Sequence, residues 1–566
     1  MKIKDAGLKS LDNPKMPYKN ISLKKTVKGY WSRNSGLIIS WANFLFFFLI
    51  SRLPFFLAYP VVAFRRDCVS YYMLVDQMAK GFWPCLSIRT IGYPLFLKLV
   101  FFFSHRNFAV VAVQHLLTLF CSLLFIYAVH RFYGRFRLIS VSTGVALGVY
   151  ASSSVRVRLD CTLLTDSLFA NLILLSLATL LLGLGLKRKW ILAAASLAMA
   201  ATILVRPAGL FLVPVSILVI AFLLLSRYGR GAIVAFTLPI ISSLLAMGVY
   251  NRLTLGSFAV STFSEYSLIS FTSTYLEEHP SFGLAGNEAV RACRRAVEES
   301  DLQTLASSWE YESINRILGK YYEKNRMRVV RIFLKYEPAG SFSLYLKWQP
   351  LLKQMGTYAI RRHPRIALKY LYSKFMVYFF SNRGADYDFY KRLENDFIWS
   401  RSLRKNFSGF IVPDSSFNRM FNTRSYAATL SPAFLHFMLK EYDKPLSFKH
   451  ISLAKDGRVI LRPTIWKSLH NIWQKVHKAL FRNILWTILF FLSFLYSLCR
   501  MAITRGRHMG TFFLFLMTSS ALGYGILIVL SAFPYLRYVC ALEYVYYLCP
   551  ILFAISRLPN PWAAGK

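Results

Sequence analysis

The stretch GYPLFLKLVFFF, residues 92–103, decides how many times the chain crosses a membrane. As a helix it would measure about 18 Å at about 1.5 Å per residue, well short of a bilayer core of about 30 Å. It also contains Pro94 and Lys98. We therefore expect this segment to lie at the outer membrane interface instead of spanning the bilayer.

The composition is typical of a polytopic membrane protein. Hydrophobic residues make up 55% of the 566 residues, and the mean hydropathy is +0.41. Several apolar runs are long enough to cross a bilayer core. We expect ten spans, near residues 36–56, 107–129, 138–155, 163–186, 190–205, 208–225, 232–250, 481–503, 511–532 and 538–556.

Basic residues orient these spans. If residues 92–103 stay at the interface, four basic clusters fall on one side, and the positive-inside rule makes that side cytoplasmic. The clusters are Arg131/Arg135/Arg137, Lys187/Arg188/Lys189, Arg227/Arg230 and Arg505/Arg507. Counting 92–103 as a span would place all of them outside.

The domain boundaries follow from this topology. They are a basic cytoplasmic tail at 1–35, a transmembrane module at 36–250 whose first outer loop covers 57–106, an extracytoplasmic loop domain at 251–480, C-terminal spans at 481–556 and a short cytoplasmic tail at 557–566. The first tail is too long and polar for a signal peptide and leads into a retained anchor.

The loop at 251–480 is large enough to fold as a domain. Residues 251–477 hold 19 of the 26 acidic residues together with 34 Lys and Arg. We expect a soluble module with a basic surface, with a helical section at 288–318 and a more irregular, aromatic-rich remainder.

The net charge of +43 does not indicate nucleic acid. The basic residues are dispersed between apolar spans, and no DNA- or RNA-binding motif interrupts them. Membrane lipid head groups or phosphates are the partners that this charge favours.

Acidic residues are rare in the membrane part, and most of them map to one face. They are Asp67, Asp76, Asp160, Asp166 and Glu543. The first four fall on the outer side of the expected topology. Ordinary solvated acids would lie at both interfaces, so this one-sided placement favours a functional role.

Asp67 is the strongest catalytic candidate, in the stretch RRDCVSYY at 65–72. If this region is helical, Asp67 and Tyr71 share a face at i and i+4, whereas Asp76 points away. A plain ion pair with one of the two preceding arginines is the alternative.

Asp166 lies at the mouth of the fourth span, in LLTDSLF. The alternative to a catalytic role is that Asp166 or Thr165 caps the helix through its backbone N–H groups. Asp160 falls in the short loop before this span, where it would be exposed.

Four arginines form a second set on the acidic face. They are Arg52, Arg89, Arg206 and Arg537. Each alone would be a snorkelling interface residue. Together they indicate an anionic ligand.

These motifs, in this order, resemble those of the GT-C glycosyltransferases, in particular bacterial protein mannosyltransferase-like enzymes and the lipid A aminoarabinose transferase. The order is Asp-x-x-x-Tyr, RTIGYPLFL, LLTDSLF, LVRPAGLFL, YNRLTLGSF and a late Arg-Tyr. RRHPRIALKYL at 361–371 resembles a His-Pro-led segment of the same enzymes. The resemblance covers residues 36–270 and, weakly, the C-terminal spans. This chain has Thr90-Ile91 where Pro-Pro is common in the family.

The resemblance implies transfer of a sugar from a polyprenyl phosphate, with inversion, on the outer face of a bacterial plasma membrane. Asp67 would then lie by the acceptor hydroxyl, and Asp166 would correspond to the acid of the second loop. Arg89 would occupy the position where the family has a basic residue. The acceptor would be a glycolipid, a cell-wall glycan or a protein.

The chemistry is consistent with that role. A polyprenyl phosphate is already a competent leaving group, so one carboxylate base is sufficient, and arginines would neutralise the departing phosphate. Asp67 and Asp166 sharing a divalent cation is an open alternative. A transporter or lipid flippase, with the same acids as an ion relay, is the rival function, and a catalytically inactive scaffold is the third.

Overall fold

The computed structural model describes the helical parts of the chain in detail. The described residues are 23–58, 66–79, 90–104, 107–133, 137–226, 228–255, 258, 264–336, 347–381, 451–453, 459–461, 468, 472, 475–476, 484–504, 509–531 and 540–557. Among the expected site residues, Arg89 and Arg537 lie outside these ranges, and the backbone but not the side chain of Asp67 is described.

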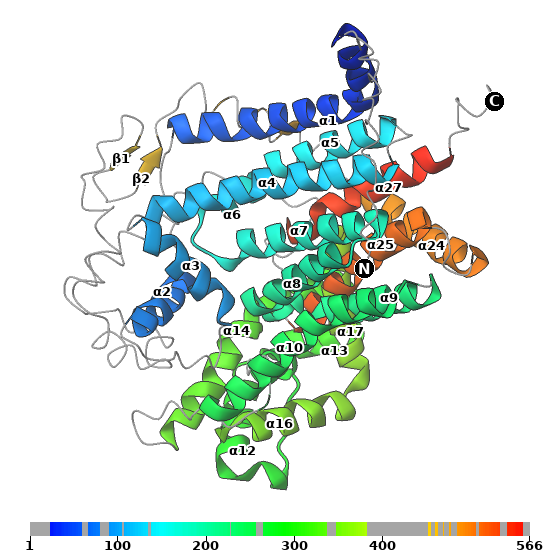
Figure 1. Ribbon diagram of the computed structural model, residues 1–566. Coiled ribbons are helices and arrows are strands. Elements are labelled where there is room, and N and C mark those ends of the chain that lie inside the picture. Colours follow the sequence, from blue (N-terminus) through cyan, green and yellow to red (C-terminus); the bar gives the residue numbers. More distant parts are fainter. Residues whose placement is uncertain are drawn as a thin grey trace, which may run out of the picture.

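The membrane part is a stack of long helices, as predicted (Figure 1). Its elements are α1 (Leu23–Ala58), α4 (Asn107–Tyr133), α5 (Arg137–Ser152), α6 (Ser154–Cys161), α7 (Thr165–Leu186), α8 (Lys189–Val205), η1 (Pro207–Phe211), α9 (Leu212–Leu225), α10 (Arg230–Leu255), α24 (Ile484–Thr504), α25 (Met509–Ser531), η4 (Cys540–Leu542) and α27 (Glu543–Arg557). Each of the ten expected spans falls on one of these helices or on the α5–α6 pair.

Seven of the described stretches are long and apolar enough to cross a membrane, and the α5–α6 pair, bent by 63°, makes an eighth. Two further expected spans, α8 and α27, are shorter apolar helices. The protein is therefore an α-helical, polytopic integral membrane protein.

Residues 92–103 form the short helix α3 (Gly92–Phe103), which has 12 residues. A helix of this length is too short to span a bilayer. One face of α3 buries Tyr93 and Leu97, whereas Phe102 and Phe103 at its end are exposed. Together with α2 (Arg66–Ala79), it lies at one end of the helix stack (Figure 1).

Small residues let α1 and α5 pack backbone to backbone. A Cβ atom added at Gly144 would meet the backbone of Ser40, and one added at Gly148 would meet Cβ of Phe47 at 2.9 Å. Such glycines, four residues apart, are a common device for close helix packing in membranes. This contact fixes α1, which carries Arg52, against the rest of the stack.

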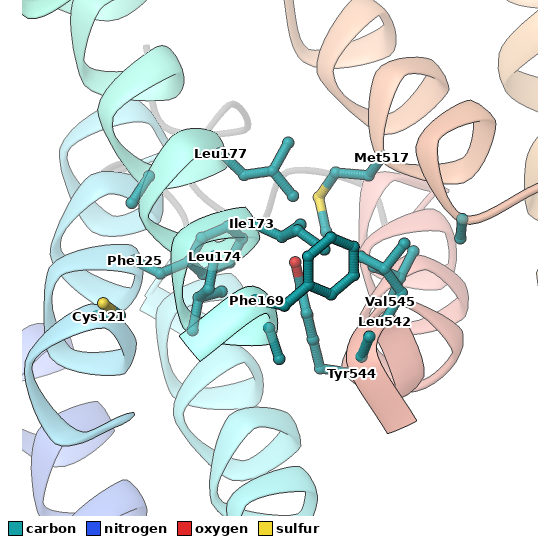
Figure 2. Packing of buried hydrophobic residues seen from close by; sticks show 14 of the residues in the cluster. Cys121, Phe125, Phe169, Ile173, Leu174, Leu177, Met517, Leu542, Tyr544 and Val545 are labelled. Atoms are coloured by element: carbon teal, nitrogen blue, oxygen red, sulfur yellow. The ribbon is translucent and has the colours of Figure 1, made fainter. Parts of the chain in front are cut away.

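The centre of the stack is apolar and joins helices from both ends of the chain. Figure 2 shows side chains of α4, α7, α25 and α27 packed together. Phe125 of α4 contacts the ring of Tyr544 of α27, with the ring centroids 6.1 Å apart. The C-terminal helix thus completes the core that the N-terminal helices begin.

Residues 264–336 and 347–381 form a second helical unit, which we call the helical domain. Its elements are α11 (Ser264–Thr272), η2 (Pro280–Phe282), α12 (Gly283–Arg294), α13 (Glu299–Ser307), α14 (Tyr311–Lys335), α16 (Gln349–Arg362), α17 (Pro364–Met376) and the π-helical turn η3 (Val377–Ser381). The domain has its own core, which includes Ile269, Val290, Ile314 and Met355. The expectation of an irregular chain after residue 318 was wrong as far as residues 319–335 and 349–381, because these segments are helical.

Two short antiparallel strands lie further along the chain. They are β1 (Ile451–Leu453) and β2 (Val459–Leu461), with Ser452 opposite Ile460.

Candidate functional site

Helix α2 brings the backbone of Asp67 to the start of α7. The neighbouring Cys68 is fully buried, and its thiol donates a hydrogen bond to the carbonyl oxygen of Leu163 at 2.9 Å. The predicted helix at Asp67 and Tyr71 is confirmed, and Tyr71 is buried against Tyr93 of α3, with the ring centroids 5.0 Å apart. Asp67 and Asp166 are therefore carried by segments in direct contact.

Asp166 occupies the first turn of α7 and is not a capping residue. The N-cap is Leu164, and no side chain caps the helix. Asp166 is instead buried and forms an ion pair with Nη1 of Arg206. The capping alternative for Asp166 and Thr165 is thus wrong, because the backbone enters the helix one residue earlier.

The turn RPAG places Arg206 opposite Asp166. Arg206 ends α8 in an extended conformation, with φ −154° and ψ 131°, because the following Pro207 disfavours a helical residue before it. Gly209 then returns against α8, where an added Cβ would lie 2.8 Å from Cα of Ile203. The Arg206 side chain keeps an exposed fraction of 15%.

The GYP motif brings α3 to the same turn. A Cβ atom on Gly92 would lie 2.6 Å from the carbonyl carbon of Leu204 and from the backbone nitrogen of Val205. Only glycine allows this approach. Arg89 lies three residues before Gly92 in the sequence, and its own position is outside the described residues.

Sequence reasoning missed a buried ionic cluster behind this turn, centred on Asp160. Asp160 is fully buried, not exposed as expected, and its Oδ2 accepts a hydrogen bond from Nη2 of Arg52 at 2.6 Å. Nη2 of Arg156 lies 3.1 Å from its Oδ1. Helix α6 follows α5 at an angle of 63°, and Asp160 on α6 is buried within the helix stack.

Arg52 is held in this cluster and does not snorkel. Besides Asp160, its guanidinium donates to the carbonyl oxygen of Ala151 at 2.6 Å and to Nδ1 of His115 at 3.0 Å. It also lies over the ring of Phe48 at 4.1 Å. These contacts bury Arg52, which is 2% exposed.

Polar side chains of α4 and α7 complete the cluster. Thr118 donates to Asp160 at 3.2 Å, and Nε2 of Gln114 donates to the Asp160 carbonyl oxygen at 2.8 Å. Ser167 donates to Oδ1 of Asp160 at 2.6 Å. Asn171 accepts from Nη2 of Arg156 at 2.5 Å. The sequence signal was the three charged residues Arg156, Arg158 and Asp160 in SVRVRLDC at 154–161, which are unusual within a span.

Two further acids of the membrane part, Asp76 and Glu543, are also buried. Asp76, near the end of α2, is 4% exposed, so of the solvated and structural roles that the sequence leaves open for it, burial favours the structural one. Glu543, in the first turn of α27, is 3% exposed and accepts a hydrogen bond from Tyr547 at 2.6 Å.

No group of three or more His, Cys, Asp or Glu converges as a metal site within the described part of the chain. The side chain of Asp67, which with Asp166 was a candidate ligand of a shared cation, lies outside the described residues.

Comparisons with known proteins give one distant match. No protein-family model matches the chain, and no curated protein matches it. Among solved structures, the archaeal oligosaccharyltransferase AglB from Archaeoglobus fulgidus, in complex with an inhibitory peptide and a dolichol-phosphate, matches with a TM-score of 0.33 and 12% identity. The match covers 92% of this chain and 50% of AglB, so the chain spans about half of that enzyme's length. A likeness at this level assigns no family to the chain.

Proposed function

We propose that the protein is a membrane glycosyltransferase of the GT-C type, which moves a sugar from a polyprenyl-phosphate donor to an extracytoplasmic acceptor with inversion. The observation that most supports this is the hydrogen bond from Cys68 to Leu163. It holds α2, with Asp67, against the first turn of α7, where Asp166 meets Arg206. The backbone that carries Asp67 and the Asp166–Arg206 pair therefore lie at the same end of the helix stack, which supports the proposal.

In the proposed reaction, the Asp67 carboxylate accepts the proton of the acceptor hydroxyl as the hydroxyl oxygen attacks the anomeric carbon. The bond between that carbon and the phosphate oxygen breaks, and the polyprenyl phosphate leaves as an anion. No general acid is required, because phosphate is a stable leaving group. Attack from the face opposite the phosphate inverts the anomeric centre.

Arg206 is proposed to bind the phosphate, and its side chain lies within the described residues. Its guanidinium is partly exposed, and its planar fork suits phosphate oxygens. Arg89 and Arg537 remain proposed ligands by sequence position, and Tyr71 is proposed to line the site. Arg52 leaves this set, because its described contacts are inside the Asp160 cluster.

The experiment is transfer from a labelled polyprenyl-phosphate sugar by the purified protein in lipid, with Asp67→Asn as the test variant. Asparagine preserves the size of the side chain and removes its basicity. We expect turnover to fall by about 10²- to 10⁴-fold, the range for loss of a general base, while donor binding persists.

Asp76→Asn, on the same short helix, is the matched control, and its turnover should fall far less. Near-normal transfer by a folded Asp67→Asn protein would remove Asp67 from the mechanism. Failure of the unmodified protein to release or transfer sugar from any polyprenyl phosphate would contradict the function itself.

A transporter or flippase is the second candidate, because the Arg52–Asp160–Arg156 cluster buries ionisable groups among membrane helices. Reconstituted vesicles distinguish the two. Movement of a labelled lipid or ion between leaflets, abolished by Asp160→Asn in a folded protein without any sugar transfer, would favour the transporter.

A further inference from the structure

Three exposed apolar side chains gather on the helical domain, and we call them the lateral patch. They are Trp309, between α13 and α14, with Leu368 and Tyr372 of α17, and their exposed fractions are 42%, 57% and 39%. The rings of Trp309 and Tyr372 meet edge to face, 6.0 Å apart. Leu368 and Tyr372 are neighbours on one helix face at i and i+4. A contiguous apolar patch of this kind marks a contact surface more often than a scattered exposed residue does.

Lys369 of α17 holds the patch against the end of α13. The Lys369 ammonium donates to the carbonyl oxygens of Leu305 and Ala306, at 2.9 and 2.7 Å, which end helix α13. The same ammonium lies 5.3 Å from the centre of the Trp309 ring. Because Trp309 is fixed on α17 in this way, the patch does not depend on a mobile loop.

The face of α17 that carries the patch leads directly to a membrane helix. Arg365, Leu368, Tyr372 and Phe375 fall within a stripe about 80° wide at about 100° per residue. Phe375, at the end of the stripe, packs against Phe491 of α24, with the ring centroids 6.4 Å apart. Thr487 of α24 also donates to the carbonyl oxygen of Phe379 at 3.0 Å. The patch is therefore continuous with the surface of the membrane part.

Helix geometry gives the distance of the patch from the membrane part. Along the axis of α17, Tyr372 lies about 4.5 Å and Leu368 about 10 Å from Phe375, which contacts Phe491 of α24. The patch is thus within about 10 Å, along α17, of a contact with an apolar membrane helix. Trp and Tyr concentrate at the interfaces of membrane proteins.

We propose that the lateral patch inserts into the headgroup layer of the bilayer and docks the helical domain on the membrane. The charges near the patch in the sequence are mixed, because Arg365 precedes it on α17 and Glu310 and Glu312 follow Trp309, and all three are exposed. The attachment is therefore apolar and aromatic, and it does not require anionic lipid. This inference is independent of the proposed glycosyl transfer.

The test places a nitroxide label at Leu368→Cys and, separately, at Tyr372→Cys, in protein reconstituted into phosphatidylcholine nanodiscs. Leu284→Cys is the matched control, because Leu284 is a 79% exposed leucine on α12 of the same domain. Parent protein carried through the same labelling corrects for native cysteines such as the exposed Cys499. Collisions with oxygen, which concentrates in lipid, are compared with collisions with a water-soluble nickel complex.

We expect the labels at 368 and 372 to favour oxygen and the label at 284 to favour nickel. The same ratios should appear when anionic phosphatidylglycerol is added. Labels at 368 and 372 that behave like the label at 284 would overturn the proposal. So would protection from nickel in native membranes but not in nanodiscs, since that result indicates a protein partner.

Discussion

The Ser167 hydroxyl donates a 2.6 Å hydrogen bond to Oδ1 of Asp160. Ser167 follows Asp166 in the sequence. The first turn of α7 is therefore hydrogen-bonded to the buried cluster through Ser167, while Asp166 forms its ion pair with Arg206. The position of the Asp166 side chain therefore depends on a carboxylate that does not itself reach the site surface.

The Asp160 cluster should be essential for stability. Asp160→Asn would leave Arg52 and Arg156 buried without their shared counter-ion, which costs about 3 to 5 kcal/mol. Thermal unfolding in detergent or lipid measures the loss. Thr179→Val, which removes a hydroxyl of α7 bonded only within its own helix, is the control and should change stability little. Equal stability of the two variants would contradict a buried ion pair.

Arg206 should govern donor binding. Arg206→Ala removes a charge-assisted contact to phosphate, and we expect donor binding to weaken about 10- to 150-fold, the equivalent of about 1.5 to 3 kcal/mol. Arg206→Lys should recover part of the binding, since a lysine restores the charge but not the planar fork. Arg188→Ala, at the other end of α8, should bind donor normally; an equal loss there would show a structural effect.

Gly92 should tolerate no side chain. The Cβ atom of Gly92→Ala would lie 2.6 Å from backbone atoms of Leu204 and Val205, which cannot move without displacing the turn at Arg206. We expect a loss of about 1 to 3 kcal/mol in stability and weaker donor binding. Gly523→Ala, which meets nothing within 4 Å on α25, should be neutral or stabilising. Unchanged donor binding by Gly92→Ala would separate α3 from the site.

Lys374, in the helical domain, should make stability rise with pH. Burial lowers the pKa of its amine to about 7, from an ordinary value of 10.5. The unfolded chain therefore binds more protons above pH 7, and the free energy of unfolding should increase by about 1 to 3 kcal/mol between pH 7 and 9. The rings of Phe271 and Tyr322, 4.6 and 5.5 Å from the amine, favour its charged form and reduce the effect. Unfolding of Lys374→Met should lack this increase; an identical pH profile in both proteins would exclude the lysine as its source.

The loop between α7 and α8 should be cytoplasmic. It contains the exposed Lys187 and Arg188 and is followed by the exposed Lys189, the first residue of α8. A thiol in Arg188→Cys should react with an impermeant reagent only after the membrane is opened, whereas one in Leu284→Cys should react from outside. Labelling of the Arg188→Cys thiol in sealed cells would overturn the orientation.

The sequence predicted the helices well because hydropathy and length are local properties. The ten expected spans and the short helix at 92–103 each match a helix or the bent pair. The sequence did not predict the helices α16 and α17. Charged residues separate their apolar residues, so no long apolar run marks them.

The partners of charged residues could not be predicted in the same way. Arg52 and Asp160 are 108 residues apart, and their pairing depends on how α1 packs on α5. The pairing of Asp166 with Arg206 depends likewise on the turn after α8. A single sequence shows that these residues are charged, but only the packing of the helices decides which charges meet.

The packing of α27 against α4 has a consequence for biosynthesis. Phe125 and Tyr544 meet in the core, yet the ribosome makes α27 long after α4 and α7 have entered the membrane. Until then, the side of Phe125 that contacts Tyr544 lacks this partner and must face lipid or a chaperone. A nascent chain that stops before α27 would therefore present an unfinished core to membrane proteases, and full-length synthesis becomes a checkpoint for the assembly of the candidate site.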